Sequence, residues 1–385
     1  MRLTPNPEII AWAIERCGKT PKDLKSAFPR IQEWIEGQGR PPTAKQVEKL
    51  AKRTHVLPSY FYKEEIPDLS LQIPDFRTMD SKAPVNPSPE LYDVINQMLS
   101  RQDWLSGYLE EMGAEPIEFI GCCSEAKSIG DCAARMWDLL DLKPGWARGK
   151  QGSAAVKFLR DHIEALGVYV YAGSYFGNVT TRPFDEKEFR GFVLTDSYAP
   201  VIFLNTRDAY SAQLFTLAHE FAHILFNESG VDDAMLGREN KGKEDRCNAL
   251  AAEFLVPASL LHPAFDEHDI NSALKELEKL TGASAIVVLR RAKDLGRITQ
   301  KEFFDRYDAY MEELPERLER KEARNSGTGA PSPYVLKKNH LGSLFTETIF
   351  TALKSEYLLY SDAYRLTGMK ANFFNEYYRR EGMYV

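Results

Sequence analysis

The stretch SAQLFTLAHEFAHILFNESG at residues 211–230 constrains the fold of this chain more than any other part of it. Apolar residues occur on almost every side of a helix drawn through it, a pattern typical of a helix buried on all faces rather than of a surface helix. Two histidines lie inside this apolar segment, and buried imidazole rings need polar partners. The segment therefore predicts a buried helix that carries a polar site.

The polar residues of this helix have the spacing HExxH. His219 and His223 are four residues apart, so both rings project from one side of a helix, with Glu220 beside them. This arrangement is typical of zinc hydrolases, in which the two histidines hold the metal and the glutamate acts as a base. Taken alone, the pentapeptide leaves a second interpretation open, in which backbone carbonyls or water satisfy a pair of core histidines.

The composition is that of an ordinary globular protein. With 385 residues, of which 43% are hydrophobic and 27% charged, the chain can form roughly two to four domains with at least one large core. It has no apolar run typical of a signal peptide or a membrane span. Its five cysteines show no CxxC spacing, which argues against a disulfide framework and against a cysteine zinc site. We therefore expect a cytoplasmic protein with reduced thiols.

Charge is unevenly distributed along the chain. Residues 1–65 carry twelve Lys and Arg against eight Asp and Glu, a balance of +4, whereas the remainder, with 37 against 48, has a balance of −11. A basic head on an acidic body indicates separate roles for the two parts. Glycine and proline breaks divide the head into short predicted helices at 7–17, 21–28, 31–37, 43–54 and 59–62.

This head resembles the repressor-type (XRE-like) helix-turn-helix domain, which implies DNA contact through residues 1–66. From Leu24 to Trp34, however, the chain is about four residues shorter than the family pattern, at the turn and the start of the recognition helix. Sequence-specific binding, phosphate contact without sequence choice, and a protein-interaction module all stay open. The matching stretches are KTPKDLKSAF and IQEWIEGQGRPPTAKQVEKLAKRTHVLPSYFY, with family framework residues at Trp34, Glu36, Gly37, Pro42, Leu50 and Ala51.

Three short strands, VYVYAG, FRGFVLTD and PVIFLN, are predicted immediately before the HExxH helix. They predict a small sheet with one face packed against that helix. By analogy with zinc peptidases of the HExxH type, the edge of such a sheet would align an extended substrate. Helical patterns dominate the rest, so the predicted fold class is α+β and mostly helical. The helices are expected at 90–112, 124–140, 153–166, 270–280, 284–295, 299–313, 341–355, 361–367 and 370–379.

A catalytic zinc ion needs a third protein ligand and an open position for water. In KEDRCNALAAEFLVP, apolar residues recur at helical spacing and define an inward face, on which Glu244 falls, whereas Glu253 points to roughly the opposite side. We therefore predict Glu244 as the third ligand, with Asn248 supporting its carboxylate one turn later. The alternatives downstream are Glu228, Asp232, Asp233, Glu239, Glu253, His262 and His268.

The two motifs HEFAH and EDRCNALAAEFLVP together resemble the ImmA/IrrE family of metallopeptidases. The upstream strands and IPDFRT add to this resemblance, which covers roughly residues 1–300. It implies a gluzincin-like Zn²⁺ site held by His219, His223 and Glu244, with Glu220 as the general base. No residue for stabilising the oxyanion is assigned, although Tyr210 and His262 lie within reach along the chain. The second motif matches the family at Glu244, Cys247, Asn248, Ala251, Ala252, Leu255 and Pro257.

These features predict a head at 1–66, a linker and helical region at 67–150, a peptidase domain at 151–315, a linker at 316–333, and a helical C-terminal domain at 334–385. The resemblance implies an endopeptidase that cleaves a protein, such as a transcriptional repressor in a stress, prophage or mobile-element switch. The alternative is a DNA- or protein-binding regulator, such as the antitoxin of a toxin-antitoxin module, with a structural or vestigial zinc site. Both interpretations imply a macromolecular partner and no membrane.

Overall fold

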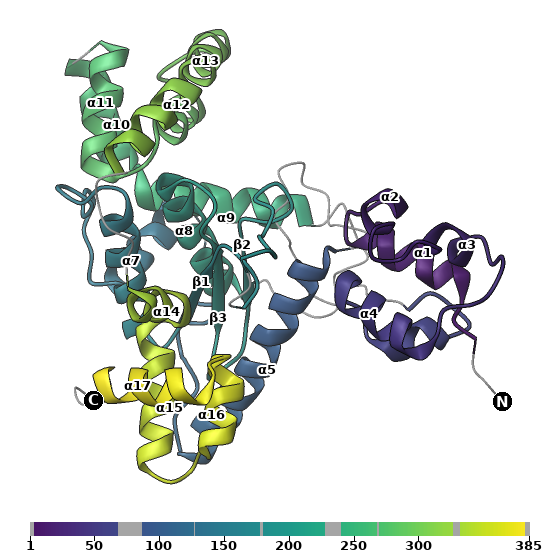
Figure 1. The fold of residues 1–385 in the computed structure, drawn as a ribbon. Helices are drawn as coiled ribbons and strands as arrows, with labels where there is room; N and C mark the ends of the chain where they lie inside the picture. Colours follow the sequence, from purple (N-terminus) through teal and green to yellow (C-terminus); the bar gives the residue numbers. More distant parts are fainter. Residues whose placement is uncertain are drawn as a thin grey trace. The chain divides into compact units, whose positions relative to one another are not determined.

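The computed structural model describes residues 4–67, 87–126, 128–177, 180–227, 240–267, 269–325 and 332–381 (Figure 1). The IPDFRT stretch and five of the alternative ligands therefore lie outside the described residues. Within these ranges, none of the helices combines the length and the hydropathy that crossing a bilayer requires. The fold is mostly helical with a single three-stranded sheet among the described residues, which confirms the predicted fold class. The five alternative ligands that lie outside the described residues are Glu228, Asp232, Asp233, Glu239 and His268.

The chain divides into two compact units. The first contains the described parts of residues 1–72, 82–99 and 175–184, and the second contains those of 100–174 and 185–385. Helix α5 (Pro89–Glu111) contributes residues to both units. The domain boundaries expected from the sequence stay a prediction.

The first unit contains the basic head, whose five short helices lie close to the predicted ranges. They are α1 (Pro7–Arg16), α2 (Pro21–Leu24), α3 (Ile31–Ile35), α4 (Ala44–Thr54) and the 3-10 helix η1 (Pro58–Tyr62). Local capping explains where two of them begin, because Asn6 accepts a hydrogen bond from Glu8 N and Thr43 forms a capping box with Gln46. Their apolar faces form one core around Ile10, Ile14, Leu24, Phe28, Trp34, Leu50 and Phe61.

The sheet of the second unit has the strand order β1-β3-β2. Strand β1 (Tyr169–Gly173) pairs in parallel with β3 (Val201–Asn205), and β2 (Gly191–Leu194) pairs antiparallel with β3. All residues of the three strands are buried. Helix α8 (Tyr210–Phe226) packs against β2 and β3, which confirms that a face of the sheet covers the HExxH helix.

Other helices enclose α8 on its remaining sides. Helix α7 (Ser153–Ala165) and α9 (Asn240–Leu255) contact α8, and α6 (Ile129–Leu139) packs on α9. The helices α10 (Ala258–Glu267), α11 (Ile270–Thr281), α12 (Ala285–Asp294) and α13 (Gln300–Asn325) then follow, each packed on the next.

Helix α13 corrects one expectation from the sequence. It runs to Asn325 rather than ending near Glu313. The stretch ERLERKEAR lacks the apolar periodicity used to locate helices, but Glu, Arg, Leu, Lys and Ala are all strong helix formers.

The C-terminal helices dock directly on the sheet and on α7. They are α14 (Pro333–Leu341), α15 (Ser343–Lys354), α16 (Tyr360–Thr367) and α17 (Ala371–Glu381), of which α14 was not expected. Helix α14 packs against β1, and α15 packs against both β1 and α7.

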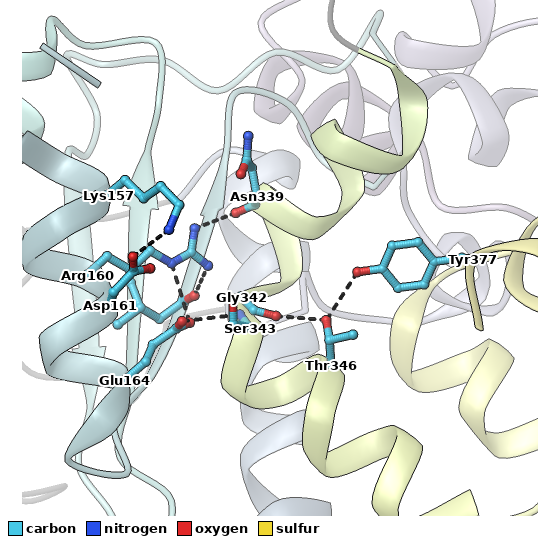
Figure 2. A network of polar contacts seen from close by, with 10 residues as sticks. Lys157, Arg160, Asp161, Glu164, Asn339, Gly342, Ser343, Thr346 and Tyr377 are labelled. Atoms are coloured by element: carbon cyan, nitrogen blue, oxygen red, sulfur yellow. Dashed lines mark hydrogen bonds and ion pairs between the residues drawn. The ribbon is translucent and has the colours of Figure 1, made fainter. Parts of the chain in front are cut away.

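Figure 2 shows the polar network at this junction. Arg160 donates to the carbonyls of Val170 and Asn339 and pairs with Glu164, which in turn accepts a 3.2 Å hydrogen bond from Ser343 N. Because these groups come from α7, β1 and the α14–α15 turn, the C-terminal helices belong to the same packed unit as the sheet.

Candidate metal centre

Two helices bring together three of the residues predicted from the sequence. On α8, the Nε2 atoms of His219 and His223 are 3.0 Å apart. On α9, the two carboxylate oxygens of Glu244 are each 3.3 Å from one of those nitrogens. One donor atom from each residue lies within 4.8 Å of the others, and this is the one group of its kind among the described residues. The three side chains are close enough together to hold one metal ion.

Helix α8 holds both histidines rigidly because it is buried along almost its whole length. Its last turn would otherwise leave backbone carbonyls unsatisfied in the core. A turn preceding α6 supplies the missing donors: Gly121 N donates to Ile224 O at 3.0 Å, and Cys123 N donates to Leu225 O at 2.8 Å. Asn227 ends the helix in a left-handed conformation. The end of α8 that carries His223 is therefore fixed by hydrogen bonds as well as by packing.

The three residues differ in their access to solvent. The side chains of His219 and His223 are 1% and 2% exposed, whereas that of Glu244 is 24% exposed. Burial would raise the pKa of Glu244, but its hydrogen bonds to the two histidines hold that pKa well below the usual range. The centre is therefore enclosed on the α8 side and partly open at Glu244, as a site that admits water requires.

The neighbours of His223 favour a positive charge at its imidazole. Burial would lower the pKa of His223, but its hydrogen bonds to Cys247 and Glu244 and the nearby charge of Glu220 raise that pKa well above the usual value. A metal ion at this position competes with the proton, because a ligating imidazole must offer a free lone pair. Two imidazole nitrogens and a carboxylate also form the set of donors that zinc prefers. The residues present fit a zinc ion.

Glu220 is not part of the three-ligand group. It is buried on α8, and its Oε1 atom would lie 3.4 Å from a Cβ atom added at Gly191 of β2. The same added atom would lie 2.6 Å from Thr216 Cγ2 and 2.9 Å from Phe203 O. Glycine at this position therefore lets β2 approach α8 closely beside the glutamate. In the sequence, the glycine inside the strand FRGFVLTD is the signal for this contact, because a glycine within a strand often marks a place where another element packs close to the backbone.

Cys247 contacts His223, and the sequence did not predict this contact. Its Sγ atom is 3.4 Å from Nδ1 of His223, on the ring edge opposite to Nε2. The sequence placed Cys247 on the inward face of its helix and among the residues that match the second family motif, but it assigned no role at the site to this residue. Asn248, predicted to support Glu244, is partly buried on the same helix, and its supporting role stays a prediction.

The remaining candidates lie away from the three-ligand group. Glu253 forms an ion pair with Arg291 of α12 and accepts a hydrogen bond from Ala258 N, so it ties α9 to the helices that follow. Tyr210 is the first residue of α8, at the end remote from His223. His262 is partly buried on α10. Neither Tyr210 nor His262 belongs to the metal-binding group.

Comparison with known families agrees with this geometry. Residues 175–293 match the peptidase-family model described as the IrrE N-terminal-like domain. This segment contains α8, α9 and the three donors. Residues 341–380 match a domain of unknown function (DUF8813), and no curated protein matches the chain. The central part of the chain is thus similar to a peptidase family, in agreement with the ImmA/IrrE resemblance seen in the sequence.

Proposed function

We propose that this protein is a zinc-dependent endopeptidase with His219, His223 and Glu244 as metal ligands and Glu220 as general base. The observation that carries the proposal is the convergence of both Nε2 atoms and both carboxylate oxygens of Glu244 at one point, inside the segment that matches a peptidase family. A pair of core histidines satisfied by each other would not need a carboxylate from a separate helix.

Each residue has a distinct role in the proposed reaction. When bound, zinc supplies a water of lowered pKa and polarises the scissile carbonyl. The buried Glu220 accepts the proton of the attacking water and passes it to the leaving amine nitrogen. Packing of α8 against β2 and β3 holds Glu220 in place, so the proton transfer needs no rearrangement of the helix.

The roles of base and ligand can be separated by two substitutions. Glu220→Gln removes the base but keeps the ligands, so we expect zinc content to stay at one ion per chain while proteolysis is lost. Glu244→Ala removes a ligand, so we expect zinc to be released. Glu253→Ala is the control, because it breaks the pair with Arg291 and lowers stability but leaves the three donors intact. Wild-type protein that holds no zinc when purified without chelator would refute the proposal.

The substrate we propose is a protein, in particular a DNA-binding regulator such as a repressor. This follows from the ImmA/IrrE resemblance and from the presence of a basic helical head on the same chain. The product of the adjacent gene is the first substrate to test, by incubation with wild-type protein and with Glu220→Gln. A regulator that acts by binding alone, such as an antitoxin, keeps its biological effect in Glu220→Gln, whereas a protease loses it.

We propose a second, weaker role for the head, which is contact with nucleic-acid phosphates. Helix α4 exposes Lys45, Lys52 and Arg53 along its outer face, whereas α3 has only five residues and pairs its Glu33 with Arg30. Phosphate contact without sequence choice fits these charges better than base reading does. Fluorescence anisotropy with mixed-sequence duplex DNA should show binding that weakens as salt rises and on charge reversal at Lys45 and Lys52. Affinity that depends on sequence but not on salt would contradict this role.

A further inference from the structure

We infer that Cys247 is a positioning residue for the metal centre: its sulfur accepts the Nδ1–H of His223 and thereby turns the Nε2 lone pair of that ring toward the metal. The inference rests on the proposed function, because it concerns the same three-ligand site. It adds a residue that acts through His223 rather than on the metal or the substrate.

The two nitrogens of His223 face different neighbours. Nε2 lies 3.0 Å from Nε2 of His219 and 3.3 Å from Glu244 Oε1, so it faces the metal position. Nδ1, on the other edge of the ring, lies 3.4 Å from Cys247 Sγ, within hydrogen-bonding range for sulfur. A neutral imidazole that ligates through Nε2 carries its proton on Nδ1, and that N–H needs an acceptor. The sulfur of Cys247 stands where this acceptor must be.

Burial makes the contact significant. Cys247 is 0% exposed and His223 is 2% exposed, so bulk water does not compete for Nδ1–H. Leaving a buried donor unsatisfied costs about 1–3 kcal/mol. Without the sulfur, the ring would relieve this cost by moving the proton to Nε2 or by rotating, and either change removes the lone pair from the metal position.

The helical register of α9 explains how one element serves both edges of the ring. Cys247 follows Glu244 by three residues, so the two side chains project from neighbouring positions on the same side of the helix. Glu244 reaches the Nε2 edge and Cys247 reaches the Nδ1 edge of His223. Because both side chains belong to one helix, the carboxylate and the sulfur hold the ring between them.

Other proteins usually place a carboxylate, a backbone carbonyl or water behind a ligating histidine, and loss of that partner typically lowers metal affinity by about 10–100-fold. A thiol is a weaker acceptor than a carboxylate, and it adds no formal charge to a site that already contains Glu244. Serine at position 247 would retain an acceptor, whereas alanine would remove it. We therefore expect metal affinity to be highest in wild type, lower in Cys247→Ser and lowest in Cys247→Ala.

The test compares Cys247→Ala and Cys247→Ser with a control in which another buried thiol is removed. Cys132→Ala is that control, because Cys132 is 2% exposed on α6 and its loss opens a small cavity in the same core without removing the contact to His223. Zinc affinity is measured on the full chain by competition with a chromophoric chelator. We expect a 10–100-fold loss for Cys247→Ala, a smaller loss for Cys247→Ser, and a change of less than about twofold for Cys132→Ala.

A second readout follows the His223 ring itself. Nitrogen-15 and proton NMR of histidine, recorded on zinc-loaded protein, detects the Nδ1–H of His223 and the strength of the hydrogen bond that it donates. We expect a hydrogen-bonded Nδ1–H in wild type and in Cys132→Ala, and the loss of this hydrogen bond in Cys247→Ala. Equal zinc affinity and an unchanged Nδ1–H signal in Cys247→Ala would overturn the inference. Wild-type protein that binds no zinc would instead refute the proposed function, and with it the inference that depends on it.

Discussion

Gly342, in the turn between α14 and α15, is the residue whose substitution most directly tests how the C-terminal helices are attached. Its backbone has φ 84° and ψ 155°, a region that is essentially restricted to glycine. An added Cβ atom would lie 2.7 Å from Val170 O and 2.9 Å from Arg160 Nη2, and would also collide with Glu164 Oε1. Gly342→Ala therefore strains the backbone and displaces the charged pair shown in Figure 2.

The expected loss of stability follows from the backbone strain and from the displaced ion pair. The backbone conformation costs about 1–3 kcal/mol for a residue other than glycine. Displacing one partner of a buried ion pair costs about 3–5 kcal/mol, and the side chains of Arg160 and Glu164 are only 11% and 6% exposed. Because a small shift of the turn relieves part of the strain, we expect Gly342→Ala to lower the free energy of unfolding by at least about 3 kcal/mol.

The matched control is Gly368→Ala at the end of α16. Gly368 has φ 66° and ψ 22°, an ordinary left-handed helix end, and an added Cβ atom would meet nothing within 4 Å. We expect this control to lose about 1 kcal/mol. Urea denaturation gives the two free energies, and amide hydrogen exchange of α15 and α17 shows where protection is lost. If Gly342→Ala and Gly368→Ala were equally stable and equally protected, the inferred attachment at this turn would be refuted.

Two further predictions concern the sheet and the same C-terminal junction. Gly191→Ala forces β2 away from Thr216 and Glu220. We expect the free energy of unfolding, measured by urea denaturation, to fall by about 1–3 kcal/mol, and proteolysis to fall more than zinc content. Unchanged proteolysis would contradict the close packing beside Glu220. Burial and the neighbouring Lys337 and Arg160 charges lower the pKa of His340 to about 4. The folded state therefore binds this proton less readily than the unfolded state, and acidification from pH 6.5 to about 4 should cost up to about 3 kcal/mol. His340→Gln should remove this part of the acid sensitivity, and an identical pH profile of stability for wild type and His340→Gln would disprove it.

Helices α15, α16 and most of α17 lie in residues 341–380, the segment that matches a domain of unknown function. Arg101 of α5 is buried, stacks over Tyr171 of β1 and donates to Leu366 O at the end of α16. Together with the Arg160 network, this contact joins α16 and the α14–α15 turn to the strand that forms one edge of the sheet. A free strand edge is open to pairing with other chains. Packing of α15, which belongs to this segment, on β1 beside α14 is one physical role for the segment.

The sequence by itself determined most of the elements and their kinds. An apolar segment without a polar face located α8, and apolar residues at helical spacing located α9. Short β-branched and aromatic runs located the three strands. Helix α14 was not predicted because its sequence PYVLKKNHL has no clear apolar face. Its packing on β1 stabilises the helix instead. The charged C-terminal end of α13 was not predicted for a related reason, because helix propensity rather than an apolar pattern stabilises it.

The sequence also indicated which carboxylate would lie beside the histidines, because position along a helix determines which face a residue occupies. Glu244 lies on the same side of α9 as the buried residues, whereas Glu253 is directed to Arg291. What only the tertiary structure decided are the contacts between elements distant in the chain. These include the parallel pairing of β1 with β3, the approach of Gly191 to Glu220, and the placement of Cys247 behind His223. Such contacts depend on how elements pack, and the periodicity of one segment carries no information about its neighbour in space.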